Sequence, residues 1–187
     1  MKKIVIFASG SGTNAENIIK YFETSKTAKV TAVLTNNATA KVIERASKYG
    51  ITATIFSQKE LIEGEIIQFL QKTNPDLIVL AGFLLKLPPT ITQAYPDKII
   101  NIHPALLPKY GGKGMYGMNI HNAIITNKEI ETGITIHFVN ENYDEGAIIF
   151  QQKVGITDCQ TAEDVAKKIQ ALEQYHFPEI IEQLITK

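Results

Sequence analysis

The sequence predicts a single α/β domain, built on a mostly parallel sheet and spanning residues 1–187. Short runs rich in β-branched residues alternate with longer amphipathic segments, which is the pattern of repeated strand–helix–strand units. The length of 187 residues and the hydrophobic fraction of 44% fit one domain with a substantial core. Neither an internal repeat nor a Gly/Ser linker divides the chain.

The first half of the chain supplies the parallel units. A strand is expected at 4–8, where the apolar run IVIFA stops at a glycine-rich turn, and a helix follows at 14–22. The same alternation then repeats along the chain. It predicts a strand at 30–35, a helix at 39–49, a strand at 52–56, a helix at 59–72, and strands at 77–81 and 99–102.

The second half begins with a loop at 109–117, which holds too many glycines for the interior of an element. A helix at 119–126 leads to strands at 132–139 and 147–154, and their short connection predicts an antiparallel pair. The last helix, at 161–185, opens with Thr161 as a candidate cap and with Glu163 and Asp164 at its positive end. We therefore expect a Rossmann-like layered sheet, mostly parallel, with an antiparallel C-terminal strand pair and helices on both faces.

Composition narrows the classes of function. Lys plus Arg and Asp plus Glu both count 19, so the overall charge gives no reason to expect a nucleic-acid partner. The single cysteine, Cys159, has no partner for a disulfide or a zinc pair, which favours a cytoplasmic protein without a metal. The apolar run after Lys3 is too short for a signal peptide or a membrane span.

A glycine turn joins the first strand to the first helix and reads SGSGTNA over 9–15. Exposed N–H groups at such a turn, together with the positive end of the helix, favour a bound phosphate. The spacing also fits G-x-G-x-x-A, but the second strand ends in TNNA at 35–38, without the acid that a dinucleotide's ribose requires. A plain tight turn remains the alternative.

Two polar pairs occur in otherwise apolar strands. Asn101 and His103 lie two residues apart at the end of a strand, so they share a face, and Pro104 fixes the exit of the chain. Thr135 and His137 share a face in the same way. The alternatives are a histidine bonded within the core for the first pair and a solvated strand face for the second. Asp144 by itself is typical of a turn, and it is a candidate catalytic residue only if it lies close to His103 in the folded chain.

Four stretches of the chain resemble the glycinamide ribonucleotide formyltransferases of purine synthesis: SGSGTN, AGFLLKL, NIHPALLPKY and GITIHFVNENYDEG. The similarity runs in the family's order from the first strand to the last helix, so it covers nearly the whole chain. The resemblance implies 10-formyltetrahydrofolate as the formyl donor and a catalytic set of Asn101, His103 and Asp144. In that set Asn101 and a protonated His103 would stabilise the tetrahedral intermediate, with Asp144 raising the pKa of the imidazole and assisting proton transfer.

The resemblance also implies roles in binding. Gly12, Thr13 and Asn14 would hold the substrate phosphate, and Glu173 would bind its ribose. Thr135 and His137 would support the site. The folate would contact Leu84, Leu85, Lys86 and Leu87, together with Asn101, Asn140, Glu141, Asn142, Tyr143 and Asp144, and Lys59 would pair with its glutamate tail. A solvated helix face for Glu173, core positions for the leucines and a plain surface charge for Lys59 remain alternatives.

The chain departs from the family at two places. Leu84-Leu85 stands where the family often has Met-Arg, and the loop at 111–117 is longer than usual, which suggests a mobile flap. Other folate-dependent formyltransferases, the formyltetrahydrofolate hydrolase and a non-catalytic nucleotide-binding module remain alternatives. The methionyl-tRNA formyltransferase is disfavoured because we expect no additional RNA-contacting domain beside this one. The hydrolase is disfavoured because we expect no additional regulatory domain. A homodimer is left open.

Overall fold

The computed structural model describes residues 1–187 as a seven-stranded sheet in the order β3-β2-β1-β4-β5-β6-β7. The strands are β1 (Lys2–Phe7), β2 (Ala28–Thr35), β3 (Ala53–Ile55), β4 (Leu77–Leu80), β5 (Ile99–His103), β6 (Glu131–Phe138) and β7 (Ile148–Gly155). The helices are α1 (Thr13–Ser25), α2 (Val42–Ser47), α3 (Gln58–Glu63), α4 (Glu65–Thr73), α5 (Pro89–Ala94), α6 (Met118–Thr126) and α7 (Ala162–Thr186). No helix is long and apolar enough to cross a membrane.

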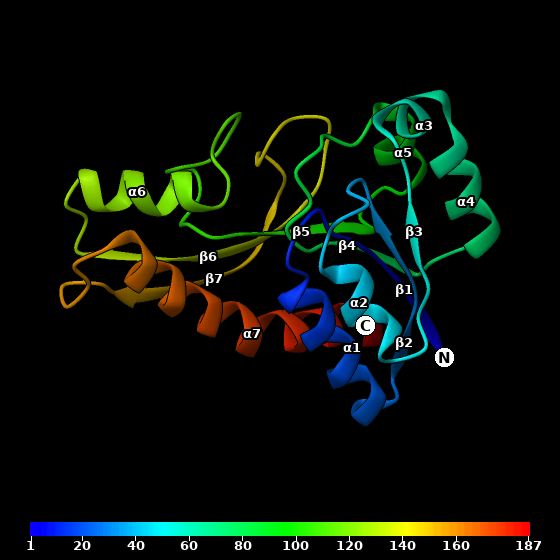
Figure 1. The fold of residues 1–187 in the computed structure, drawn as a ribbon, viewed down its shortest axis with the longest axis horizontal. Helices are drawn as coiled ribbons and strands as arrows, with labels where there is room; N and C mark the ends of the chain where they lie inside the picture. Colours follow the sequence, from blue (N-terminus) through cyan, green and yellow to red (C-terminus); the bar gives the residue numbers. More distant parts are fainter.

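The sheet has the predicted mixture of directions. Strands β1 to β5 pair in parallel, whereas β6 runs antiparallel to β5 and β7 antiparallel to β6. Helices cover both faces, and Figure 1 shows the long helix α7 lying beside α1. The predicted fold class is therefore confirmed.

The core lies in two layers because β1 is buried on both faces. Ile4 and Ile6 point into a cluster of 30 buried residues that also takes side chains from α1, α2, α6 and α7. Val5 and Phe7 point into a cluster of 14 buried residues on the other face, which is covered by α3, α4 and α5. Since parallel strands must be covered on both sides, β1 reads as a continuous apolar run in the sequence.

Two helix predictions need correction, and one helix was missed. The helix expected at 59–72 is divided into α3 and α4 at Gly64, whose φ of 99° lies in the left-handed region that ends a helix. The helix expected at 39–49 is confined to α2, and α5 was not predicted. The start of α7 is as expected, because the Thr161 side chain accepts from the Asp164 N–H and the Asp164 carboxylate accepts from the Thr161 N–H.

Candidate active site

A cavity of about 740 Å³ opens at the carboxyl ends of β1, β4 and β5. Its wall combines the turn after β1, the segment after β4, the end of β5, the glycine loop, and parts of α6 and α7. The lining residues used below are Gly12, Thr13, Asn14, Leu84, Asn101, His103, Gly112, His121, Tyr143, Asp144, Gln170 and Glu173. Because parallel strands end together at this edge, segments distant in sequence meet around one space.

Strands β5 and β6 bring the two polar pairs together. The antiparallel register sets Asn101 opposite His137 and His103 opposite Thr135. The β6 pair is not solvated, because Thr135 is 0% exposed and His137 is 2% exposed. The alternative of a solvated face is therefore wrong, because Leu107 and Gln151 contact Thr135 and the loop that carries Asp144 contacts His137.

Asp144 joins these residues from the loop between β6 and β7. Its Oδ2 lies 3.6 Å from His103 Nδ1, and its Oδ1 lies 3.6 Å from His137 Nε2. The Gly112 N–H donates to the same Oδ2 at 2.9 Å, so the glycine loop holds the carboxylate from a third side. Asp144 has a φ of 54°, a left-handed conformation that costs energy for a residue other than glycine and is typical of functional positions.

The protonation of His103 follows from its two partners. The Tyr110 carbonyl can only accept, so Nε2, at 2.8 Å from it, carries a proton, and Nδ1 faces Asp144. Burial lowers the pKa of His103 by more than Asp144 and Tyr110 raise it. The expectation of a cationic His103 near neutrality is therefore not met in this structure, because desolvation outweighs the neighbouring carboxylate.

Hydrogen bonds also hold the other side chains of this wall in place. His137 Nδ1 donates to the Phe138 carbonyl at 2.8 Å, which leaves Nε2 to accept from Asn101 Nδ2 at 3.2 Å. The Asn101 amide is thereby oriented with one N–H left for a ligand. Thr135 Oγ1 donates to the Ala105 carbonyl at 2.7 Å, which anchors the turn that follows His103.

Asp144 remains an anion among these groups. Burial raises its pKa, but the His137 and His103 side chains and the Gly112 N–H lower it by more, so the net shift is downward. A carboxylate therefore faces two imidazoles at the edge of the cavity.

The opposite end of the cavity is the turn that precedes α1. Gly12 occupies the N-cap with a φ of 72°, and no side chain caps the helix. The first N–H groups of α1 therefore lack intrahelical partners and remain free to bind an anion. A Cβ at Gly12 would lie 2.5 Å from the Val42 side chain, so glycine is required for contact with α2 as well as for its conformation.

Glu173 of α7 reaches this end of the cavity and is not a solvated residue of a helix face. It accepts from Asn14 Nδ2 at 2.8 Å, while Asn14 Oδ1 is buried without a partner. Burial raises the pKa of Glu173 to about 7, although the Asn14 hydrogen bond lowers it in part. A ligand at this end therefore meets an unpaired acceptor, Asn14 Oδ1, and the carboxyl group of Glu173, which can be protonated or ionised near neutral pH.

The residues expected to contact folate are only partly brought together. Leu84 lines the cavity with 52% of its surface exposed, whereas Leu87 is 3% exposed and belongs to the core, as its alternative reading allowed. Leu85 packs against the same core cluster. The Lys86 ammonium lies 5.4 Å from the centre of the Tyr143 ring, and this contact joins the two segments.

Four other predicted positions lie outside the cavity lining. Tyr143 and Asp144 line it, but Asn140, Glu141 and Asn142 are exposed residues beyond its wall. Lys59 is on α3, where its 77% exposed side chain lies 3.8 Å from Glu63, and it does not line the cavity.

Several lining residues were not found from the sequence. Gln170 lies one helical turn before Glu173, and this spacing on a predicted helix was a signal that could have identified it. His121 is 6% exposed, and its Nδ1 has no hydrogen-bond partner. Nothing in its local sequence distinguishes it from an ordinary core histidine. The glycine loop contributes Gly112–Gly117 to the wall, which agrees with its expected place over the site.

Comparison with known proteins gives consistent matches along the chain. Residues 2–181 match the family described as "Formyl transferase". The chain is 36% identical to phosphoribosylglycinamide formyltransferase of Bacillus subtilis, covering 99% of this chain and 95% of that protein. It is also 36% identical to the chloroplastic phosphoribosylglycinamide formyltransferase of Arabidopsis thaliana, covering 96% of this chain but only 64% of that protein.

Solved structures show the same similarity in three dimensions. The phosphoribosylglycinamide formyltransferase of Anaplasma phagocytophilum superposes with a TM-score of 0.91 at 31% identity, covering 100% of this chain and 87% of that one. The enzyme of the same name from Bacillus halodurans superposes with a TM-score of 0.88 at 37% identity, covering 100% of this chain and 96% of that one.

Proposed function

The chain belongs to the formyl transferase family, and from that premise we propose that it transfers a formyl group from 10-formyltetrahydrofolate to the amine of glycinamide ribonucleotide, a step of de novo purine synthesis. One observation carries the proposal: Asn101, His103 and Asp144 meet at one wall of a cavity that continues to the anion-binding turn at Gly12. A reactive centre and a phosphate site therefore share one space. A cytoplasmic location and a homodimer stay predictions.

The substrates are placed by the chemistry of the two ends. The phosphate of the ribonucleotide would accept from the N–H groups of Gly12, Thr13 and Asn14, where the positive end of α1 favours an anion. Glu173 would then accept a hydrogen bond from a ribose hydroxyl, because it lies beside Asn14. The formyl-bearing part of the folate would enter between Leu84 and Tyr143, because the part of the cavity between these two side chains continues to His103.

The first chemical step is attack of the amine nitrogen on the formyl carbon. A carbon–nitrogen bond forms, the carbonyl double bond opens, and the oxygen becomes an anion. The remaining N–H of Asn101 and a proton on His103 Nδ1 would stabilise that oxygen. Donors that are already in place when the charge develops lower the barrier most; the Asn101 N–H is such a donor, and hydrogen bonds hold both side chains in position.

The proton on His103 Nδ1 is linked to Asp144. Burial lowers the pKa of the imidazole, but an oxyanion next to Nδ1 adds a second negative charge beside the carboxylate 3.6 Å away. Two anions on one side favour the imidazolium. His103 therefore takes up a proton from solvent on Nδ1, and its full charge lowers the barrier as the intermediate forms.

The second step breaks the bond between the formyl carbon and the folate nitrogen. The amine has gained a positive charge by attacking and must lose a proton, whereas the departing folate nitrogen must gain one. Asp144, acting through a water, would accept the proton of the amine and return it toward the leaving nitrogen. Its lowered pKa keeps it ionised, and its three neighbours hold it in place.

A mixing experiment tests the proposal. Purified protein is incubated with 10-formyltetrahydrofolate, with and without glycinamide ribonucleotide, while the absorbance of the folate is followed. Consumption that requires both compounds supports formyl transfer to this amine. Consumption without an amine would identify a hydrolase instead, and nucleotide binding without consumption would identify a binding module. Other amine acceptors, such as an amino-sugar nucleotide, serve as specificity controls.

A further inference from the structure

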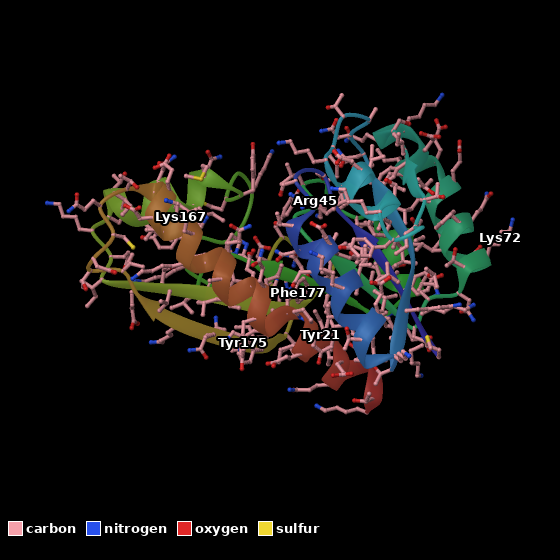
Figure 2. The ribbon with its side chains drawn as sticks, turned by 60° about the horizontal axis from the view of Figure 1, so that its bottom comes forward. Tyr21, Arg45, Lys72, Lys167, Tyr175 and Phe177 are labelled. Atoms are coloured by element: carbon pink, nitrogen blue, oxygen red, sulfur yellow. The ribbon has the colours of Figure 1, made fainter.

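Arg45 is the only arginine in the sequence, and it lies beside the anion-binding turn. Its Nε donates to the Ser11 carbonyl at 2.9 Å, and its Nη1 contacts the Glu16 carboxylate. Figure 2 shows Arg45 next to the first turn of α1. A guanidinium can make both contacts because its donors point in fixed, separate directions, whereas a lysine has a single nitrogen.

Glu16 poses an electrostatic problem for a phosphate site. It lies in the first turn of α1, and its backbone N–H donates to the Gly12 carbonyl at 2.9 Å, so its position is one helical turn from the N-cap. The N-terminus of a helix attracts anions, and a carboxylate in the first turn competes with a phosphate for that field. An uncompensated Glu16 would also repel a dianionic phosphate directly.

Three cations act on Glu16, namely Arg45, Lys20 and Lys48, and Arg45 is the closest and the least exposed of them. Its side chain is 31% exposed, whereas that of Lys20, whose ammonium is 3.8 Å from Glu16, is 58% exposed and more strongly screened by solvent. Burial raises the pKa of Glu16, but the hydrogen bond and charge of Arg45 outweigh this effect and leave the pKa low. Glu16 is thus an anion whose charge Arg45 offsets.

Helix α2 fixes Arg45 in this place. The Val42 N–H donates to the Gly10 carbonyl at 3.2 Å, and the Val42 side chain packs against Gly12. Arg45 lies one turn further along the same helix and closes the third contact to the turn, at Ser11. The turn is therefore attached to α2 at three consecutive residues.

We propose that Arg45 is a positioning residue for the substrate phosphate: it neutralises Glu16 and fixes the turn at Ser11, so that the free N–H groups of α1 meet a phosphate instead of a competing carboxylate. The inference rests on the proposed function for the identity of the substrate. It requires only that the turn binds a sugar phosphate, which can be measured without turnover.

The test is a charge-pair cycle read out by calorimetric binding of ribose 5-phosphate to the whole protein. Arg45→Gln leaves Glu16 uncompensated and should raise the dissociation constant about tenfold, corresponding to about 1.4 kcal/mol. Glu16→Gln should bind as tightly as the original protein or more tightly. The double variant, with both charges removed, should recover to within about threefold of the original.

Controls separate this role from a structural one. Lys2→Gln removes a cation from the opposite end of β1, where Lys2 pairs with Asp76 at 3.2 Å, and should leave binding unchanged. The KM for formyl-folate should stay within about twofold of the original in every variant, because a phosphate effect is confined to one substrate. If Arg45→Gln does not fold, Arg45→Lys keeps the charge and should bind within about threefold of the original.

The inference is overturned if Arg45→Gln binds ribose 5-phosphate as tightly as the original protein, or if the double variant binds no better than Arg45→Gln. A failure of the proposed function looks different. In that case the binding series follows the expected order, but no formyl group reaches glycinamide ribonucleotide.

Discussion

Replacing Asp144 with asparagine tests the central charge of the site. Asparagine has the same shape and adopts the left-handed conformation more readily than most residues, so the φ of 54° at this position should be retained. The change removes one negative charge and leaves an oxygen that can still accept from Gly112. The fold should therefore survive while the electrostatics change.

The magnitude follows from the distance of 3.6 Å between Asp144 Oδ2 and His103 Nδ1. At an effective dielectric constant of about 20, a carboxylate and an imidazolium at this separation attract by about 4 to 5 kcal/mol. Local reorganisation recovers part of this in the variant. We expect a loss of about 3 to 4 kcal/mol in the transition state, which is a fall of about 10²- to 10³-fold in kcat.

The assay compares kcat and the KM for formyl-folate, because the charge acts mainly on the intermediate. KM should change by less than about threefold while kcat falls. Glu145→Gln is the matched control: it neutralises an exposed acid next to Asp144 in the chain and should leave kcat unchanged. A folded Asp144→Asn protein that turns over at the original rate would refute the proposed role.

Three further predictions concern the cavity wall. Gly12→Ala should raise the KM for the ribonucleotide by at least about tenfold and lower the free energy of unfolding by about 2 kcal/mol or more, because the new Cβ meets Val42 at 2.5 Å. Gly10→Ala is the control, because no atom lies within 4 Å of its new Cβ. The same KM and melting temperature for both variants would count against the argument. Glu173 has a pKa raised from 4.5 to about 7, so the folded state holds a proton that the unfolded state releases, and stability falls as the pH rises from 4.5 to 7. Glu173→Gln should remove this fall and melt at least about 3 °C higher than the original protein at pH 8, measured by circular dichroism; equal pH profiles would contradict the shift. Thr135→Val leaves the Leu107 N–H and the Ala105 carbonyl without their side-chain partner, so the free energy of unfolding measured in urea should fall by about 2 to 4 kcal/mol. A fall of less than about 1 kcal/mol would show that the hydroxyl is not needed to anchor the turn.

The element order was predictable because it depends on local periodicity. Runs such as 4–8 and 77–81 are apolar throughout, as strands buried on both faces must be, and they became β1 and β4. One boundary that failed depended on a single residue with a special backbone angle. Gly64 divides a stretch whose apolar spacing is otherwise helical, and its φ of 99° was not visible in that spacing.

The sequence by itself determined the alternation of strands and helices, the shared face of Asn101 and His103, and the glycine turn before α1, because each of these follows from residues that are close in the chain. Only the tertiary structure decided what those groups meet. Asp144 reaches His103 through a loop between two strands, and Arg45 reaches Glu16 through the packing of α2 on the turn. The direction of the His103 pKa shift was likewise a tertiary property, because it depends on how much water the surrounding chain removes and not on which acid lies nearby.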